Sequence, residues 1–477
     1  MPLVLGVDSS TQSTKLEARD ADTGALVAVG RAPHPPTTPP RSEQDPDAWW
    51  DALHAAFAQS GVDGRDVAAV SVAGQQHGLV VLDADGRVIR PAKLWNDTES
   101  APDAGWLVKQ LSADGAGGEA AWAEACGSVP VAAFTITKLS WLHRSEPDAW
   151  SRVARVCLPH DWLTWRLSGE FVTDRGDASG TGYFSAARDE YALDLLAVVD
   201  DTVDWTTRLP RVLAPTQAAG STRAFGPDAI VAPGTGDNMA AAIALDMRPG
   251  DLARSLGTSG TVYTVSESPT ADPTGAVAGF ADATGRYLPL VCTLNATKVT
   301  EALARWLGVD HAGLDALALA SPVGANGVTV VPYFDGERTP NRPTASGTMV
   351  GLRTATTRAD LARAAVEGVV CGLLDGLDAL IAAGVRADGS IRLVGGGARS
   401  AAFQRVVADL SGRPVLVPDE SDHVAAGACA QAAAALHERD ISDVAHAWGL
   451  ARGPMIEPDA RADRDAVRAA YAEARRD

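Results

Sequence analysis

The chain has 477 residues, a formal net charge of -19, and a composition that is 46% hydrophobic and 21% charged. This composition is close to that of ordinary globular proteins and argues against extensive disorder. A length prior of roughly 150 residues per domain suggests two large domains or three modest ones, and we take two as the working expectation. The strong negative charge argues against nucleic acid or an anionic membrane as the main partner, because both attract basic patches.

The cysteines and the N-terminus indicate a cytoplasmic protein. The five cysteines are scattered without metal-ligand spacing, so we expect them to be reduced and mostly buried. Met1 leads directly into a strand pattern, with no signal-peptide pattern, and no apolar run is long enough to span a bilayer. In such an acidic chain, we expect a bound phosphate to be held in a local pocket by backbone N–H groups and a metal cation.

The first hundred residues predict an α/β domain. Apolar runs at 3–8 and 67–74 predict strands, and 78–95 predicts a strand pair that turns at an Asp-Gly step. Between the first two strands, Asp45 is a candidate N-cap for a helix with apolar residues at helical spacing. From about 106 to 220 the pattern is more helical, and its seven tryptophans are expected mainly in the core.

A second α/β region begins near Ile230. Further along, Thr357 and Asp360 form a capping-box pattern that predicts a helix to about residue 383. Glycines recur every fourth residue along that helix, which favours close packing against a neighbouring element. The tail from Arg461 predicts a solvated helix. No Pro/Ser linker separates the halves, so the restart of the strand pattern places the domains at 1–246 and 247–477.

Two segments share one local pattern: "LGVDSSTQSTK", from Leu5, and "RSLGTSG", from Arg254. Each is a strand, a turn rich in Ser, Thr or Gly, and a second strand. Such a turn exposes backbone N–H groups and hydroxyls that can hold phosphate oxygens, and Asp8 in the first could hold a metal. Either one alone could be an ordinary polar hairpin, but the pair favours phosphate binding.

Two further motifs could carry chemistry. "GGGARS" lies between a predicted strand and helix, where a backbone can approach a nucleotide closely. It is not a dinucleotide fingerprint, and the chain has no P-loop pattern. In "GTGDN", Asp237 could accept a proton from a substrate hydroxyl, coordinate a cation or simply cap a helix, and Asn238 could bind neighbouring hydroxyls.

In this order, these motifs resemble the FGGY family of carbohydrate kinases, within the superfold of actin, heat-shock chaperones and sugar kinases. The likeness covers nearly the whole chain and is strongest to bacterial members that phosphorylate D-xylulose. The segments that carry it are "LGVDSSTQSTK", "AGQQHGLVVLD", "LWND", "FTITKLSWLHRSEPD", "LPHDWLTWRLSGEFVTDRGDASGTGYF", "GTGDN", "SLGTSG", "YFDGERTPNRP", "EGV" and "GGGARS". Two positions depart from the common pattern: Ser10 replaces a glycine, and Gln76 stands where methionine is frequent.

The resemblance implies an α/β fold of two actin-like, ribonuclease H-like domains facing each other across a nucleotide and sugar cleft. It implies sugar binding by the N-terminal domain, nucleotide binding by the C-terminal domain, one phosphate hairpin from each, and ATP and Mg²⁺ as cofactors. The residues that would contact ATP or Mg²⁺ are Asp8 at the metal, Thr11 near the transferred phosphate, Gly257 and Thr258 at the phosphates, and Gly395, Gly396 and Gly397 at the nucleoside.

The resemblance also assigns the sugar site. Asp237 would be the general base that takes a proton from the terminal hydroxyl of a ketopentose, with Gln76, His77 and Asn238 as further sugar contacts. The implied reaction is ATP-dependent phosphorylation of D-xylulose to D-xylulose 5-phosphate in pentose catabolism, and a homodimer fits the family's tendency. Two alternatives stay open: the same chemistry on another ketose or polyol, such as D-ribulose or a tetritol, and a sugar-independent actin-like ATPase.

Overall fold

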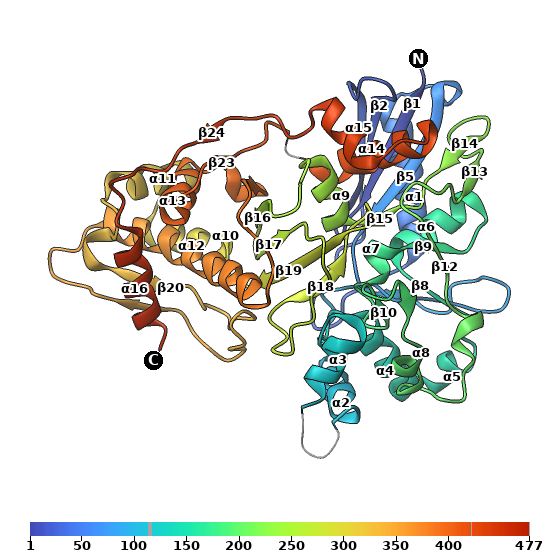
Figure 1. Ribbon diagram of the computed structural model, residues 1–477, viewed down its shortest axis with the longest axis horizontal. Helices are drawn as coiled ribbons and strands as arrows, with labels where there is room; N and C mark the ends of the chain where they lie inside the picture. The colour runs from blue at the N-terminus through green and yellow to red at the C-terminus, as the bar shows by residue number, and fades with distance from the viewer. Residues whose placement is uncertain (113–116, 421, 477) are drawn as a thin grey trace. The chain divides into compact units, whose positions relative to one another are not determined.

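The computed structural model describes residues 1–112, 117–420 and 422–476. They form two compact units of mixed helices and strands (Figure 1). Unit 1 comprises the described parts of 1–246, 267–288 and 422–451. Unit 2 comprises the described parts of 247–266, 289–421 and 452–477.

Unit 1 is built on a seven-stranded sheet with the order β13-β14-β5-β1-β2-β3, and β15 also pairs with β5. Strand β1 is antiparallel to β2 and parallel to β5. Because β15 is also parallel to β5, the carboxyl ends of these three parallel strands lie at one edge of the sheet. The strands are β1 (Leu3–Ser9), β2 (Ser13–Asp20), β3 (Leu26–Pro33), β5 (Val67–Gly74), β13 (Gly220–Thr222), β14 (Ala229–Val231) and β15 (Thr235–Gly236).

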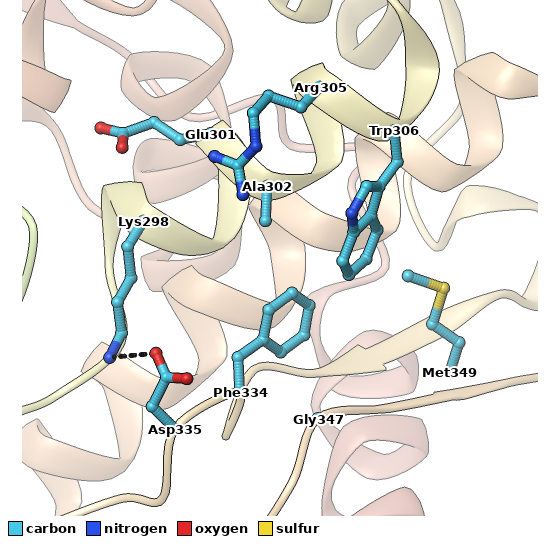
Figure 2. Close-up of a pocket in the computed structure, with 9 residues that line it drawn as sticks. All are labelled: Lys298, Glu301, Ala302, Arg305, Trp306, Phe334, Asp335, Gly347 and Met349. Atoms are coloured by element: carbon cyan, nitrogen blue, oxygen red, sulfur yellow. Dashed lines mark ion pairs between the residues drawn. The ribbon is translucent and has the colours of Figure 1, made fainter.

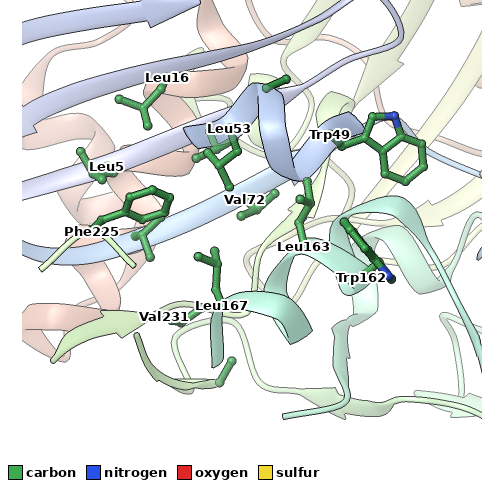
Figure 3. Close-up of a cluster of buried hydrophobic side chains, with 14 of the residues drawn as sticks. Leu5, Leu16, Trp49, Leu53, Val72, Trp162, Leu163, Leu167, Phe225 and Val231 are labelled. Carbon is green, nitrogen blue, oxygen red and sulfur yellow. The ribbon is translucent and has the colours of Figure 1, made fainter. Parts of the chain in front are cut away.

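One face of this sheet packs against α1 (Pro46–Ser60) and α6 (Pro159–Ser168) around a hydrophobic core (Figure 3). Trp49 of α1 meets Trp162 of α6 edge to face, with ring centroids 6.2 Å apart. Both indoles are buried, and the large area that each removes from water stabilises this layer. Asp45 caps α1, as expected, by accepting the N–H of Asp47.

The opposite face carries α14 (His423–His437), an alanine-rich helix that Figure 1 shows beside the N-terminal strands. Side chains alternate along a strand, so Gly6 faces this helix while Leu5 and Val7 face the core. A Cβ on Gly6 would lie 2.0 Å from the carbonyl oxygen of Ala425, so only glycine permits this contact. The same helix packs on α9 (Asp237–Ala244).

The segment between the strands of unit 1 is helical and rich in loops, as its pattern predicts. Trp122 and Trp162 are fully buried, whereas Trp106 is 43% exposed. The remaining elements of unit 1 are β4 (Glu43–Gln44), η1 (Gly64–Asp66), β6 (Val80–Leu82), β7 (Ala92–Lys93), α2 (Ala101–Gln110), α3 (Gly118–Cys126), α4 (Thr135–Ser145), α5 (Pro147–Trp150), β8 (Arg155–Cys157), β9 (Val172–Asp174), α7 (Arg175–Ala178), β10 (Phe184–Ser185), β11 (Glu190–Tyr191), α8 (Leu193–Ala197), η2 (Trp205–Thr207), β12 (Arg211–Leu213), β18 (Ala278–Ala281) and α15 (Ile441–Trp448).

The sheet of unit 2 has the order β19-β17-β16-β22-β23-β24. Its hairpin β16/β17 is antiparallel, and β22 lies parallel to β16 on the other side. The elements are β16 (Leu252–Leu256), β17 (Gly260–Thr264), β19 (Tyr287–Thr293), α10 (Thr297–Leu307), α11 (His311–Ala320), η3 (Ala325–Gly327), β20 (Thr329–Val331), β21 (Thr348–Val350), α12 (Arg358–Ala382), β22 (Ile391–Val394), η4 (Gly396–Arg399), α13 (Ala401–Ser411), β23 (Val415–Leu416), β24 (Met455–Ile456) and α16 (Arg464–Ala474).

The two units repeat one topology. In each, an antiparallel hairpin is followed by a third antiparallel strand, and the first hairpin strand has a parallel neighbour: β3-β2-β1-β5 in unit 1 and β19-β17-β16-β22 in unit 2. This duplication confirms the α/β class and the two-unit organisation, and it explains why the sequence contains two similar hairpins.

Helix α12 begins with the expected capping box of Thr357 and Asp360. Close packing requires glycine at one position of the helix's glycine stripe. At Gly368 a Cβ would lie 2.2 Å from the carbonyl oxygen of Val330. At Gly372 a Cβ would meet nothing closer than 3.7 Å, so packing does not require glycine there.

Two details differ from the sequence predictions. In the expected strand pair at 78–95, β6 pairs with β8, and two isolated antiparallel bridges, Leu82 with Val88 and Leu79 with Lys93, span the turn. The tail helix α16 is not wholly solvated, because Val467 and Tyr471 are buried.

All five cysteines are free thiols, and only Cys292 is partly exposed. Among the described residues, no helix is long and apolar enough to cross a membrane.

Candidate active site

Strand ends of unit 1 gather the predicted sugar and metal residues. Asp8 lies near the end of β1 and pairs in register with Ala73 of β5, and Gly236 of β15 pairs with Gly74. Gln76 and His77 follow β5, and Asp237 follows β15 directly. The ends of parallel strands are where α/β sheets commonly bind ligands.

Asp237 is held by the residue that follows it. The backbone N–H and the side-chain Nδ2 of Asn238 donate to the same oxygen, Oδ1 of Asp237, at 2.7 and 2.9 Å. Burial raises the pKa of Asp237 to about 6, against the opposing effect of these two hydrogen bonds. A carboxylate with this pKa is ionised at neutral pH and is a better proton acceptor than an exposed aspartate.

The predicted sugar contacts join this carboxylate. Nδ2 of Asn238 also donates to Oε1 of Gln76 at 2.8 Å, while Nε2 of Gln76 is buried without a hydrogen-bond partner among the described residues. Nδ1 of His77 donates to the carbonyl oxygen of Gly180 at 2.6 Å, which fixes the orientation of the ring. The structure therefore brings Gln76, Asn238 and Asp237 into one hydrogen-bonded group.

Asp8 has the properties of a cation ligand. Burial and the neighbouring carboxylates of Asp237 and Asp422 raise its pKa to about 7, despite the opposing charge of Lys15. Its Oδ1 is buried without a hydrogen-bond partner among the described residues. An unpartnered carboxylate oxygen in a negative environment fits a hard cation such as Mg²⁺, which prefers oxygen ligands.

The tip of the first hairpin is closed by its own residues. The backbone N–H and the Oγ of Ser10 both donate to the carbonyl oxygen of Ser13, at 3.1 and 3.0 Å. Ser10 does not have a positive φ, so serine replaces glycine there without backbone strain. The hydroxyl of Thr11 donates to Gln75 and accepts from the indole N–H of Trp95, a 44% exposed ring of the "LWND" segment for which the sequence predicted no role.

Unit 2 gathers the predicted nucleotide residues. Gly257 and Thr258 of the second hairpin line a cavity of about 590 Å³ together with Gly396 and Gly397. This volume lies within the usual range for small-molecule sites. Gly395 has φ +86° and packs against the carbonyl oxygen of Leu256, so it shapes the strand end behind the cavity.

The same cavity contains residues that sequence reasoning missed. They come from α10, α11 and α13, which carry no glycine-rich signal, namely Thr297, Glu301, His311, Asp315 and Phe403, and the cavity also contains Arg399 and Ser400 of the "GGGARS" motif. Asp310 caps α11, and Ser400 caps α13, but the N-cap residue of α10, Ala296, provides no side-chain cap. The first N–H of α10, from Thr297, donates to the carbonyl oxygen of Gly257 at 3.0 Å. An uncapped helix N-terminus offers N–H groups and a partial positive charge to an anion, as expected for phosphate binding in an acidic protein.

A second cavity of about 630 Å³ lies along α10 in unit 2 (Figure 2). There Trp306 stacks on Phe334, with ring centroids 5.6 Å apart, and Lys298 pairs with Asp335 at 3.0 Å. Glu301 lines both cavities. None of the residues proposed from the sequence lies in this second cavity.

Comparisons with known proteins place the chain in a family. Residues 3–244 match the N-terminal domain, and residues 252–436 the C-terminal domain, of the FGGY family of carbohydrate kinases. A protein named xylulose kinase from Streptomyces coelicolor is 49% identical over 461 residues, which cover 96% of this chain and 92% of that protein. The chain therefore belongs to the FGGY family of carbohydrate kinases.

Solved structures agree with this assignment. The crystal structure of xylulose kinase from Bifidobacterium adolescentis has a TM-score of 0.87 and 42% identity, covering 99% of both chains. A gluconate kinase from Lactobacillus acidophilus has a TM-score of 0.89 at 23% identity, covering 99% of this chain and 97% of that one, which shows a shared fold alone. The protein is an ATP-dependent sugar phosphotransferase, and the fold by itself does not select the sugar.

Proposed function

We propose that this enzyme transfers the γ-phosphoryl group of ATP to D-xylulose and forms D-xylulose 5-phosphate. The observation that carries the proposal is the hydrogen-bonded group of Gln76, Asn238 and Asp237 at adjoining strand ends. The 49% identity to a protein named xylulose kinase, over nearly the whole chain, favours this sugar over other ketoses and polyols.

In the proposed mechanism, Asp237 is the general base. Oδ1 is occupied by the two donors of Asn238, so Oδ2 is the oxygen that takes the proton from the terminal sugar hydroxyl. Loss of that proton lets the hydroxyl oxygen attack phosphorus in line with the leaving oxygen. Gln76 offers a buried amide N–H to a sugar hydroxyl and thereby orients the substrate.

Asp8 would hold Mg²⁺ at the edge of the same sheet. When bound, the ion supplies charge neutralisation for the phosphate oxygens. The hairpins would supply N–H groups and hydroxyls: Thr11 from the first, and Gly257 and Thr258 from the second. Gly396 and Gly397 would allow the backbone to approach a nucleoside in the cavity of unit 2, and Gly395 would shape the strand end behind it.

We also propose a division of labour between the two halves of the chain. The sugar residues and the first hairpin belong to 1–246, and the nucleotide residues and the second hairpin to 247–477. ATP is made and consumed inside the cell, so we place the enzyme in the cytoplasm. The homodimer stays a prediction.

A direct test is coupled ADP release with Mg·ATP and a panel of D-xylulose, D-ribulose, a tetritol, glycerol and D-gluconate. We expect D-xylulose to give the highest kcat/KM by a wide margin. The variant Asp237→Ala should remain folded and lose about 10²- to 10⁴-fold in turnover, the usual contribution of a general base.

The other outcomes separate the alternatives. A higher kcat/KM on D-ribulose or a tetritol would reassign the substrate within the same chemistry. ADP release that no sugar stimulates would favour the sugar-independent ATPase. Normal turnover by Asp237→Ala would remove the general-base role.

A further inference from the structure

A buried histidine lies behind the proposed sugar site and contacts both segments that carry its residues. His160, in the first turn of α6, has no exposed surface. A Cβ on Gly74 would lie 2.8 Å from Cβ of His160, and a Cβ on Gly234 would lie 2.7 Å from its Cδ2. Gly74 immediately precedes the Gln75–His77 segment, and Gly234 precedes Thr235–Asp237, so the imidazole fits between the two segments.

Three buried carboxylates surround this imidazole. Nδ1 of His160 donates to Oδ2 of Asp177 at 2.7 Å, and its Nε2 lies 3.2 Å from Asp161 and 3.7 Å from Asp174. Burial by itself lowers the pKa of His160, but these three carboxylates outweigh it and raise the pKa to about 9. An imidazolium here offsets part of the negative charge of the three enclosed acids, so removing it leaves buried carboxylates without a cationic partner.

The carboxylates connect the histidine to the sugar residues through ion pairs, hydrogen bonds and short stretches of backbone. Oδ2 of Asp174 accepts from Oγ1 of Thr235 at 2.8 Å, and Thr235 lies two residues before Asp237. Asp177 belongs to the turn that ends at Gly180, whose carbonyl oxygen accepts from Nδ1 of His77 at 2.6 Å. The cluster is thus connected to Asp237 by the hydrogen bond of Thr235, and to His77 by the hydrogen bond to Gly180.

Glycine is required where these groups meet. A Cβ on Gly180 would lie 2.7 Å from the His77 ring, and a Cβ on Gly176 would lie 2.7 Å from Oδ2 of Asp174. Such short separations leave no room for the segments to shift independently. Interiors packed this closely transmit a displacement instead of absorbing it.

We propose that His160 is a positioning residue of the sugar site. Its imidazolium, held by Asp177 and Asp161, sets the separation of the segments that carry Gln76 and Asp237. This inference rests on the proposed function only for the identity of the sugar. The contacts and distances around His160 do not depend on which sugar is bound. His160 itself touches neither substrate nor reacting atoms, and it acts through the backbone at Gly74 and Gly234.

The test uses variants that separate positioning from folding. His160→Asn keeps a donor near the position of Nδ1, whereas His160→Ala keeps none. Thr235→Val breaks only the bond to Asp174 and keeps the shape of the side chain, so it carries the test if His160→Ala does not fold. His54→Asn is the matched control, because His54 is a half-buried histidine on α1 that packs on Trp50 and Phe225.

Hydrogen exchange gives a readout that needs no substrate. In His160→Ala we expect amide exchange to rise by at least about tenfold in peptides covering 72–80 and 230–240. Exchange in 252–264 of unit 2 should stay at the wild-type rate, and His54→Asn should match wild type in all three. Unchanged exchange in both unit 1 segments would overturn the proposal, whether or not the protein phosphorylates a sugar.

Kinetics give the second readout. We expect His160→Ala and Thr235→Val to lower kcat/KM for the sugar by roughly 10- to 100-fold, the loss typical of a displacement near 1 Å, while KM for ATP changes by less than about twofold. His160→Asn should recover at least half of the loss on a logarithmic scale. Equal effects on sugar and ATP, or no recovery with asparagine, would indicate a purely structural histidine and overturn the proposal.

The two proposals fail in different ways. If the wild-type protein phosphorylates no sugar in the panel, the proposed function fails, and the exchange data alone decide the role of His160. If wild type phosphorylates D-xylulose and the variants retain wild-type kcat/KM for it, the function stands and the positioning role fails.

Discussion

Asn238 donates two hydrogen bonds to a single oxygen of Asp237, one from its backbone and one from its side chain. Both donors therefore stabilise the ionised carboxylate and fix its rotation, and Oδ2 accepts neither bond. Burial acts in the opposite direction and raises the pKa of Asp237 to about 6. The balance of these effects makes the carboxylate ionised, oriented and moderately basic near neutral pH.

The first prediction concerns the pH dependence of the reaction. Because the base must be ionised, kcat/KM for the sugar should fall as pH drops below about 6 and level off above about 7. Asn238→Ala removes one donor that lowers the pKa of Asp237, so the inflection should move to higher pH. Coupled ADP release between pH 5 and 8.5 measures both profiles. The exposed Asn341→Ala serves as control, and an unshifted inflection in Asn238→Ala would contradict this account.

The second prediction concerns Asp8 and the metal. Asp8→Asn removes the charge that would bind Mg²⁺ but keeps the size of the side chain, so we expect about a 10²-fold lower kcat and a higher Mg²⁺ concentration at half-maximal rate. Titration with Mg²⁺ at saturating ATP and sugar measures both quantities. The exposed Asp66→Asn should behave as wild type. An unchanged Mg²⁺ requirement in Asp8→Asn would mean that the ion is held elsewhere.

Local patterns predicted much of the fold because the relevant forces act over a few residues. The caps at Asp45 and Thr357 depend on hydrogen bonds within one turn, and the structure contains both. The strand pair at 78–95 was predicted less well, because β6 gains a distant partner in β8 that local pattern cannot reveal. The burial of Val467 and Tyr471 on the tail helix likewise depends on neighbours far away in sequence.

The candidate site is only partly visible in the sequence for the same reason. Glycine-rich turns and acidic strand ends mark Asp8, Asp237 and Gly395 in the sequence itself. The members of the cluster around His160 all lie in the quoted segment 158–184, but its pattern does not show that residues from α6, β9 and α7 meet around one imidazole after folding. The residues of α10 and α11 that line the nucleotide cavity were missed because those helices have ordinary sequences.

The third prediction compares two adjacent glycines. Gly395 has φ +86° and a Cβ there would lie 2.7 Å from the carbonyl oxygen of Leu256, so Gly395→Ala should lower both the Tm of unit 2 and the affinity for ATP. A Cβ on Gly396 would meet nothing within 4 Å, so Gly396→Ala should leave the Tm unchanged and raise only KM for ATP. Calorimetry and ATP titrations measure the pair. Equal Tm values for the two variants would show that the close contact at Gly395 does not limit stability.

The last prediction concerns stability at alkaline pH and follows from the charge of His160. Its pKa is raised from 6.5 to about 9, because the carboxylates around it outweigh the effect of burial. A raised pKa in the folded state means that the stabilisation is fully present below about pH 6.5 and is lost as pH rises through about 9. The raised pKa values of Asp161, about 7, and Asp177, about 6, arise mainly from burial and affect stability at lower pH.

The wild-type protein should therefore lose free energy of unfolding on the order of 2 kcal/mol in unit 1 between pH 7 and 9.5, seen as a Tm lowered by roughly 5 °C or more. His160→Asn has no titrating imidazole, so its Tm should be lower than that of wild type at pH 7 and nearly constant over the same range. Calorimetric scans at half-unit pH steps, with His54→Asn as control, measure the difference. The control should follow wild type, because His54 faces no cluster of carboxylates. Parallel curves for wild type and His160→Asn would mean that the buried histidine is neutral, since only a charged imidazole can lose stabilisation by deprotonation in this pH range.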